Sequence, residues 1–103
     1  MQIVKRIEIM ATSVELNKIL TGLEASGVPG YTVIRNVSGK SSRGTVSDDL
    51  SLNSLDNVYV IAFCSTEQIN VVIEKLNPIL NKFGGACFVS DAMQMTVVRC
   101  VGS

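Results

Sequence analysis

The alternation of apolar and polar residues predicts a strand at the start of the chain. In the stretch IVKRIEIM, from Ile3 to Met10, the isoleucines fall on one face, and Arg6 and Glu8 fall on the other. A strand with one apolar and one polar face is typical of a half-buried sheet. We therefore expect this segment to lie against a core on one side only.

The next segment, TSVELNKILTGLEASG, has leucine and isoleucine at helical spacing. It predicts a helix from about Ser13 to Ser26. Thr12 and Glu15 form a T-x-x-E pattern typical of a capping box at a helix start, and Gly27 is well placed as the residue after the helix. The segment GYTVIRNV that follows favours a second strand.

The same order returns after a polar interruption. The run VYVIAFC, from Val58 to Cys64, is suited to a central strand, and Ser65 with Gln68 repeats the capping box. The segment INVVIEKLNPILNKF then carries a helical stripe, in which we expect Pro78 to kink or locally break the helix.

Glycines 84 and 85 are expected to end this second helix, and the range 86–98 holds one or two further strands, ACFVSD and MQMTVV. The halves align, with IMATSVE against AFCSTEQ. A doubled βαβ unit predicts one α+β domain over 1–103 of the ferredoxin-like class, with a four-stranded antiparallel sheet and two helices on one face. The other face must meet a ligand or another subunit, so we expect an oligomer.

Composition restricts the chemistry. Nine basic and nine acidic residues cancel, which gives no reason to expect nucleic-acid binding, and histidine is absent. Most hydrolase and metal sites depend on histidine, so we expect neither an enzyme nor a metal site. Three widely spaced cysteines favour reduced thiols, and no export signal is visible, so a cytoplasmic protein is expected.

The polar interruption falls between the second and third strands, where the fold needs only a short turn. We expect a mobile loop over about 39–56, because long loops in compact domains are usually functional or disordered. Its first part, SGKSSRG, offers small residues and cations that favour a phosphate group, although the Walker A pattern is absent because Ile34 stands where a glycine is required. A flexible polar hairpin tip is the alternative.

The order of short motifs resembles the PII signal-transduction superfamily. These motifs are GYTV after the first helix, GKSSRG, a Tyr-Val-rich strand, LNPIL in the second helix, and FGG before an apolar strand. The resemblance covers most of the chain and is greatest to the PII-like branch of SbtB bicarbonate-transporter regulators and carboxysome-associated PII proteins. It implies a homotrimer that binds nucleotides in the clefts between subunits.

The resemblance also implies roles for individual residues. Thr32 matches a threonine near the adenine, and Gly84 and Gly85 match a loop whose backbone amides meet phosphate. Arg99 resembles an arginine that reaches into the neighbouring subunit's site. The loop base that closes over ribose and phosphates is matched by Gly39, Lys40, Ser41 and Arg43.

The long loop would be the T-loop of this family, which docks onto a target protein. We expect a nucleotide to favour one loop conformation, and thereby to expose or hide partner-binding residues, namely Thr45, Asp48 and Asp49. The resemblance points to a role in bicarbonate uptake or concentration, with a membrane bicarbonate transporter or a carboxysome component as the partner. Recruitment to the inner face of the membrane would follow, and bicarbonate is a further candidate ligand.

Several departures from the family pattern change these expectations. RGTVSDD replaces the Gln-Lys that follows the loop-base arginine in nitrogen-sensing members, and the loop has no tyrosine, which disfavours 2-oxoglutarate sensing and uridylylation. No lysine follows Gly85, which favours AMP, ADP or cyclic AMP over ATP. Cys100 has no second cysteine near it, so a C-terminal disulfide switch is not expected. The alternatives are a CutA-like structural trimer without nucleotide response and a nitrogen-regulatory PII protein.

Overall fold

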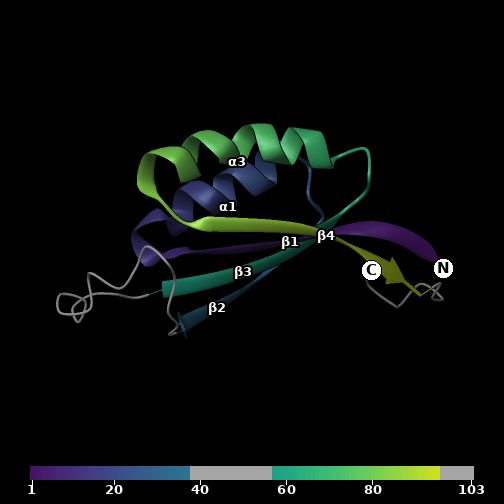
Figure 1. Cartoon of the computed structure of the whole chain (residues 1–103), viewed down its shortest axis with the longest axis horizontal. Helices are drawn as coiled ribbons and strands as arrows, with labels where there is room; N and C mark the ends of the chain where they lie inside the picture. The colour runs from purple at the N-terminus through teal and green to yellow at the C-terminus, as the bar shows by residue number, and fades with distance from the viewer. Residues whose placement is uncertain (38–56, 96–103) are drawn as a thin grey trace.

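A four-stranded antiparallel sheet carries both helices on one of its faces (Figure 1). The computed structural model describes residues 1–37 and 57–95. In chain order, the elements are β1 (Gln2–Thr12), η1 (Ser13–Glu15), α1 (Leu16–Ala25), β2 (Tyr31–Val37), β3 (Asn57–Cys64), α3 (Ile69–Phe83) and β4 (Ala86–Gln94).

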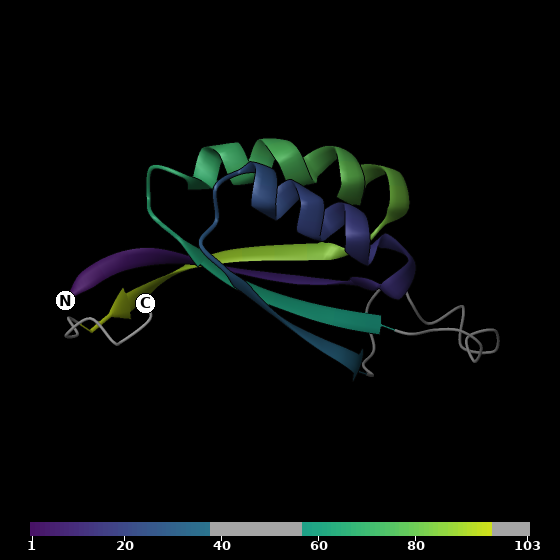
Figure 2. The ribbon, with the colours of Figure 1, turned by 180° about the vertical axis from the view of Figure 1, so that it is seen from behind.

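The strands lie in the order β2-β3-β1-β4, so β1 and β3 are central and β2 and β4 form the edges. Figure 2 shows from behind that α1 and α3 lie side by side over the same face of the sheet. This arrangement confirms the predicted ferredoxin-like α+β fold. The expected loop between the second and third strands lies outside the described residues.

The core lies between the helices and the sheet. The alternation of apolar and polar residues along β1 places the isoleucines on the side of the sheet that faces the helices. Ile7 and Ile9 point toward the helices and are fully buried, together with Val58 and Val60 of β3. Ile3 shares their face but is 53% exposed. The reason is that this end of β1 extends with β4 beyond the helices (Figure 1).

The other face of the sheet, which we call the open face, is covered by neither of the helices that the structure describes (Figure 1 and Figure 2). Its residues alternate with those of the core, as the paired registers of the four strands show. Its large side chains include Met10, Ile34, Tyr59, Ile61, Phe63 and Phe88. The expected uncovered apolar face is therefore present in this chain.

The two helices begin differently. The capping box predicted at Thr12 and Glu15 is wrong, because Thr12 makes no side-chain capping bond and is still paired with Asn57 in the sheet. A 3-10 turn follows instead, so the α-helix begins later than expected. The second capping box is confirmed. The backbone N–H of Gln68 donates to Ser65 Oγ at 3.2 Å, and the backbone N–H of Ser65 donates to Gln68 Oε1 at 3.0 Å.

Gly27 follows helix α1 as predicted, with φ of +82°. Its amide donates to the Glu24 carbonyl and the Val28 amide donates to the Leu23 carbonyl, which is the Schellman pattern. The expected break at Pro78 does not occur. Helix α3 continues through Pro78, which lies on the exposed side of the helix. Within the described residues, one strand, β4, follows α3, and no helix is long and apolar enough to cross a membrane.

Candidate functional site

Both ends of the long loop lie at the same end of the sheet. Val37, the last residue of β2, is paired with Asn57, the first residue of β3, which in turn is paired with Thr12. Gly84 and Gly85 join α3 to β4 at this end as well (Figure 1). The fold therefore brings the glycine pair to the end of the sheet from which the loop leaves.

The backbone of the glycine pair has a conformation that other residues rarely adopt. Gly84 has φ of +91° and Gly85 has φ of +126°, and the Gly84 amide donates to the Leu80 carbonyl at 2.8 Å. A Cβ at Gly85 would lie 2.9 Å from the Met10 carbonyl oxygen. Only glycine fits here, and a backbone without side chains is the kind that an anion approaches closely.

The base of the loop contains a feature that sequence reasoning missed. Asn36 has φ of +60°, and the pairing between β2 and β3 shifts by one residue between Arg35 and Val37. This is a β-bulge, which bends a strand and changes the direction in which the chain leaves it. An asparagine inside a predicted strand is the available signal, because asparagine tolerates this conformation better than most residues.

Thr32 lies on the open face near the start of β2, where it is paired with Ile61. Gly84 and Gly85 precede β4, at the opposite edge of the sheet. Three strand spacings of about 4.8 Å separate these edges, or about 14 Å. One chain by itself therefore does not bring Thr32 to the glycine pair.

The remaining predicted site residues lie outside the described residues, and their roles stay predictions. They are Gly39, Lys40, Ser41, Arg43, Thr45, Asp48, Asp49, Arg99 and Cys100.

A polar network lies in the middle of the open face. The Tyr59 hydroxyl donates to Glu8 Oε1 at 2.6 Å, and Arg6 Nε lies 3.0 Å from Glu8 Oε2. The hydrogen bond to Glu8 raises the pKa of Tyr59 above 10.0, with smaller contributions from burial and from the charge of Glu8. Sequence alternation placed Arg6 and Glu8 on one face, but Tyr59 joins them only through the register of β1 and β3.

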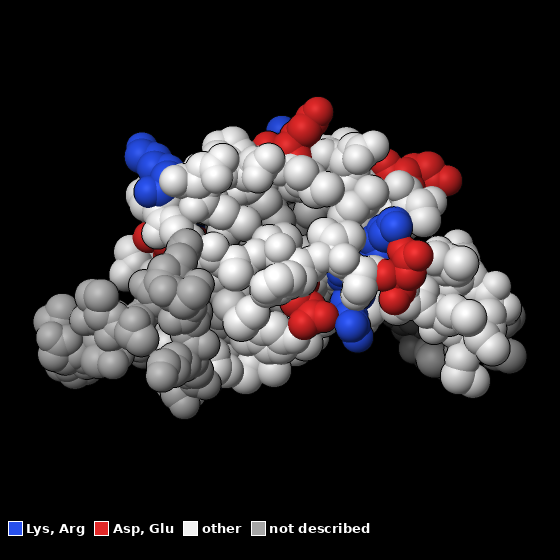
Figure 3. Space-filling model, in the orientation of Figure 1, with Lys and Arg blue, Asp and Glu red and all other residues white. Residues whose placement is uncertain are grey.

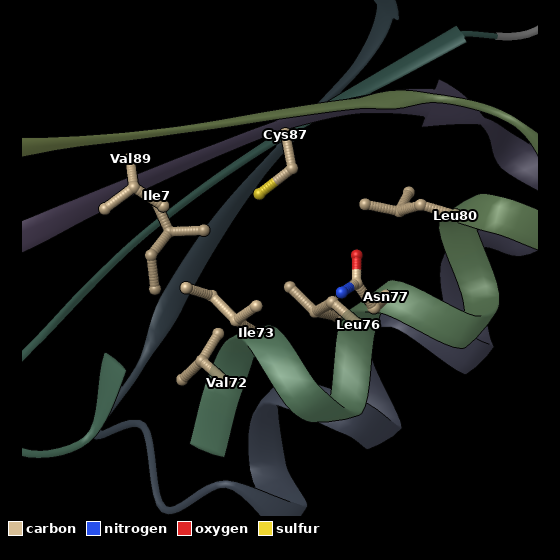
Figure 4. Close-up of a pocket in the computed structure, with 8 residues that line it drawn as sticks. All are labelled: Ile7, Val72, Ile73, Leu76, Asn77, Leu80, Cys87 and Val89. Carbon is tan, nitrogen blue, oxygen red and sulfur yellow. The ribbon is translucent and has the colours of Figure 1, made fainter. Parts of the chain in front are cut away.

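An apolar pocket of about 230 Å³ lies between α3 and β4. Figure 4 shows the Cys87 thiol and the Asn77 amide pointing into it among aliphatic side chains. Burial raises the pKa of the Cys87 and Cys64 thiols, and for Cys64 the nearby Lys5 opposes this effect. Both cysteines are free thiols, and a raised pKa makes such a thiol a weak nucleophile.

The charges are dispersed over the surface. Figure 3 shows a mostly uncharged centre over α3 and β4, with acidic and basic side chains in small separate groups around it. On this side, the described residues form no continuous basic patch of the kind that nucleic acid requires. In the described ranges, no group of three His, Cys, Asp or Glu residues is placed to hold a metal ion.

Comparison with known families identifies the class of protein. The sequence model of the family described as Nitrogen regulatory protein P-II matches residues 4–101. The chain belongs to this family, and its resemblance to the PII superfamily is confirmed. The family consists of signalling proteins, which are trimers that bind adenine nucleotides and target proteins. A comparison with curated protein sequences finds no significant match.

Solved structures of CPII from Thiomonas intermedia K12 are similar to this chain. CPII bound to ADP and bicarbonate is 28% identical, with a TM-score of 0.73, over 87% of this chain and 86% of that one. CPII bound to ADP, AMP and bicarbonate, described as a nitrogen regulatory PII-like protein, is 25% identical, with a TM-score of 0.76, over 93% and 97%. CPII bound to ADP, AMP and acetate is 26% identical, with a TM-score of 0.74, over 88% and 87%. These similarities support the PII-like branch.

Proposed function

We propose that this chain is a nucleotide-responsive signalling protein and not an enzyme. It forms a homotrimer, binds an adenine nucleotide in each cleft between subunits, and uses the loop over about 39–56 to regulate a target protein. Membership of the P-II family supports the class. The target acts in the uptake or concentration of inorganic carbon, as a bicarbonate transporter of the membrane or a carboxysome component, and the protein itself is cytoplasmic.

The observation that carries this proposal is that Val37 and Asn57, the residues before and after the loop, lie at the same end of the sheet as the glycine pair (Figure 1). Asn57 lies beside Thr12 of β1, and Gly85 lies against Met10 of the same strand. Phosphate bound by the backbone near Gly84 and Gly85 would thus be within reach of a loop that carries Lys40 and Arg43. Binding and loop conformation are coupled by this proximity.

The separation of Thr32 from the glycine pair supports a site between subunits. A nucleotide that touches both groups in one chain would have to cross the width of the sheet, whereas two neighbouring chains can each supply one edge. The described part of β4 ends at Gln94, at the other end of the sheet from Gly84. We therefore assign Arg99 to the site of the neighbouring subunit.

The preferred ligands are nucleotides with few phosphates. CPII binds ADP and AMP, and this chain has no lysine after the glycine pair for an outer phosphate. AMP, ADP and cyclic AMP are therefore proposed ahead of ATP. Bicarbonate is a second proposed ligand because CPII is bound to it as well.

Isothermal titration of the wild-type protein with AMP, ADP, ATP and cyclic AMP, each with and without bicarbonate, tests the proposal. We expect at least one nucleotide to bind well below about 1 mM. Arg43→Ala should weaken binding by about tenfold or more, because a charged hydrogen bond to phosphate is lost. Lys75→Ala, an exposed change on α3, is the control and should bind like the wild type.

Limited proteolysis tests the response of the loop. Nucleotide should change the cleavage rate between Arg43 and Leu55 in the wild type and should not do so in Arg43→Ala. A trimer that binds none of the four nucleotides below about 1 mM, and whose cleavage never changes, would instead be a structural trimer of the CutA kind.

A further inference from the structure

The open face combines an apolar surface with one ion pair at its centre. Phe88 is 57% exposed and Phe63 is 46% exposed, and they come from strands on the two sides of β1. Arg6 is paired with Phe63, and Glu8 is paired with Phe88, so aromatic rings flank both charged residues. Exposed aromatic groups around a charged centre indicate a surface that binds another protein surface.

The ion pair is incompletely satisfied within the described residues. Arg6 has five N–H donors, and the contact that joins it to Glu8 uses its Nε. Glu8 accepts from Tyr59 with one oxygen and faces Arg6 with the other, yet each carboxylate oxygen has two acceptor sites. The two side chains are 45% and 25% exposed, so both keep bonding capacity that a covering surface can reach.

The chemistry of the face itself identifies the occupant. Glu8 is the one acidic residue, and Arg6 the one basic residue, that the described strands place on the open face. A covering surface must supply a carboxylate for Arg6, a donor for Glu8 and apolar side chains for the aromatic rings. A second copy of this face supplies all three, because the face is complementary to itself in charge.

We propose that Arg6 of each copy pairs with Glu8 of the next, so that these residues form a ring of alternating charges around the symmetry axis of the oligomer. The proposal rests on the homotrimer of the proposed function and names the residues that fix how its subunits meet. Cyclic symmetry requires each copy to give one contact and receive its equivalent. Tyr59 is a positioning residue that orients the Glu8 carboxylate.

The ring would set the register of the subunits more than the strength of their association. Aromatic and aliphatic side chains tolerate sliding, whereas a charge placed against an apolar surface is strongly disfavoured. Only the registers that join Arg6 to a carboxylate are then allowed.

Charge reversal with native mass spectrometry tests the proposal in the absence of nucleotide. Arg6→Glu and Glu8→Arg each place like charges around the axis. We expect the subunit concentration at half assembly to rise by at least about tenfold in each. Mixed trimers of the two variants should form more readily than trimers of either variant alone, because two of their three contacts join opposite charges, and the double reversal in one chain should restore assembly. Lys75→Glu and Glu74→Arg, matched reversals on the exposed side of α3, should assemble like the wild type.

Circular dichroism checks folding, and Arg6→Gln is used if the reversals do not fold, because it removes the charge without repulsion. This variant should still weaken assembly. Wild-type assembly of both single reversals, or of Arg6→Gln, would overturn the proposal. If the single reversals disrupt assembly, and neither mixing the variants nor the double reversal improves it, Arg6 does not pair with Glu8 of another copy. A monomeric wild type would overturn the ring. Failure of nucleotide binding in an intact trimer would reject the sensor function alone.

Discussion

The two faces of one sheet differ in how their apolar surface is covered. Toward the helices, Ile7, Ile9, Val58 and Val60 are fully buried within the chain. Alternate residues of the same strands form the open face, where Phe88 remains 57% exposed. Both faces are rich in apolar side chains. Sequence hydrophobicity alone therefore does not distinguish the face that is covered within the chain from the face that is left exposed.

The difference teaches where stability and assembly come from. The helix face is completed inside one chain, so its contribution to folding does not depend on protein concentration. The open face gains its contacts from another molecule, so its contribution appears through mass action. Substitutions on the two faces should therefore differ in concentration dependence as well as in size.

The largest effect is expected on the helix face. Ile9→Ala removes a fully buried side chain between sheet and helices, and it should lower the free energy of unfolding by about 3 kcal/mol at any protein concentration. Urea unfolding at two protein concentrations measures this.

Met10→Ala is the matched control, because Met10 is the next residue and points to the open face with 42% exposure. Met10→Ala should lower the free energy of unfolding by less than about 1 kcal/mol in dilute monomer, and the loss should be larger at protein concentrations where the chains assemble. Equal, concentration-independent losses in the two variants would remove the distinction between the faces.

The next effect is expected at the end of the sheet, where the loop leaves. Gly85→Ala would place a Cβ 2.9 Å from the Met10 carbonyl oxygen at a φ of +126°, so it should destabilise the protein by about 2 kcal/mol. Gly30→Ala, whose new Cβ would have no atom within 4 Å of it, should change stability by less than about 0.5 kcal/mol.

Nucleotide titration of these two variants tests whether the backbone at Gly85 also contributes to ligand binding. Loss of binding in Gly85→Ala, with normal binding in Gly30→Ala, would link the glycine backbone to the ligand. Normal binding in a folded Gly85→Ala variant would place the phosphate elsewhere.

A smaller effect separates the two helix starts. Ser65→Ala removes the side-chain capping bond and leaves the Gln68 backbone amide with the Ser65 carbonyl as its acceptor, so it should cost about 1 kcal/mol. Thr12→Ala removes a side chain that caps nothing, so it should change the free energy of unfolding by less than about 0.5 kcal/mol. Thermal unfolding of both variants measures the difference, and equal losses would mean that Thr12 caps its helix in solution.

These helix starts also show what sequence can predict. Both S/T-x-x-E/Q patterns are alike, yet only Ser65 caps, because Thr12 is still held in the sheet by Asn57. The existence of the strands and helices, and the apolar face of β1, followed from apolar periodicity, which acts locally along the chain. Capping at Thr12 depended on a strand far away in sequence, and so it was not predictable from the local pattern.

The candidate site divides in the same way. Gly84 and Gly85 were predicted to end the second helix because glycine at a helix end has a local cause, whereas their role toward phosphate came from the family resemblance and stays a prediction. The Asn36 bulge and the place of Tyr59 beside Glu8 depend on strand register, which periodicity does not specify. Separation of Thr32 from the glycine pair is a property of sheet order, and it is what makes a second subunit necessary in our proposal.

The smallest effect is expected from two tyrosines, one on each face. The Tyr31 hydroxyl donates to Glu24 at 2.9 Å on the helix side, and Tyr59 donates to Glu8 at 2.6 Å on the open face. Hydrogen bonding to the glutamate is the main reason that the pKa of each tyrosine is raised above 10.0. The folded protein thus favours the neutral phenol, and each bond stabilises fully below the ordinary pKa and is lost as pH rises through the raised value.

Tyr31→Phe and Tyr59→Phe should each be less stable than the wild type at neutral pH, and the difference should shrink as pH rises above about 10. The faces should again separate, because loss of the Tyr59 bond also releases the Glu8 carboxylate that we place between subunits. The wild type and Tyr31→Phe should therefore assemble at neutral pH and dissociate at the same alkaline pH. Tyr59→Phe should already assemble less well than both at neutral pH. Sedimentation and urea unfolding across this pH range measure both effects. Identical assembly of the two phenylalanine variants at neutral pH would show that Tyr59 does not position Glu8 for a neighbouring chain.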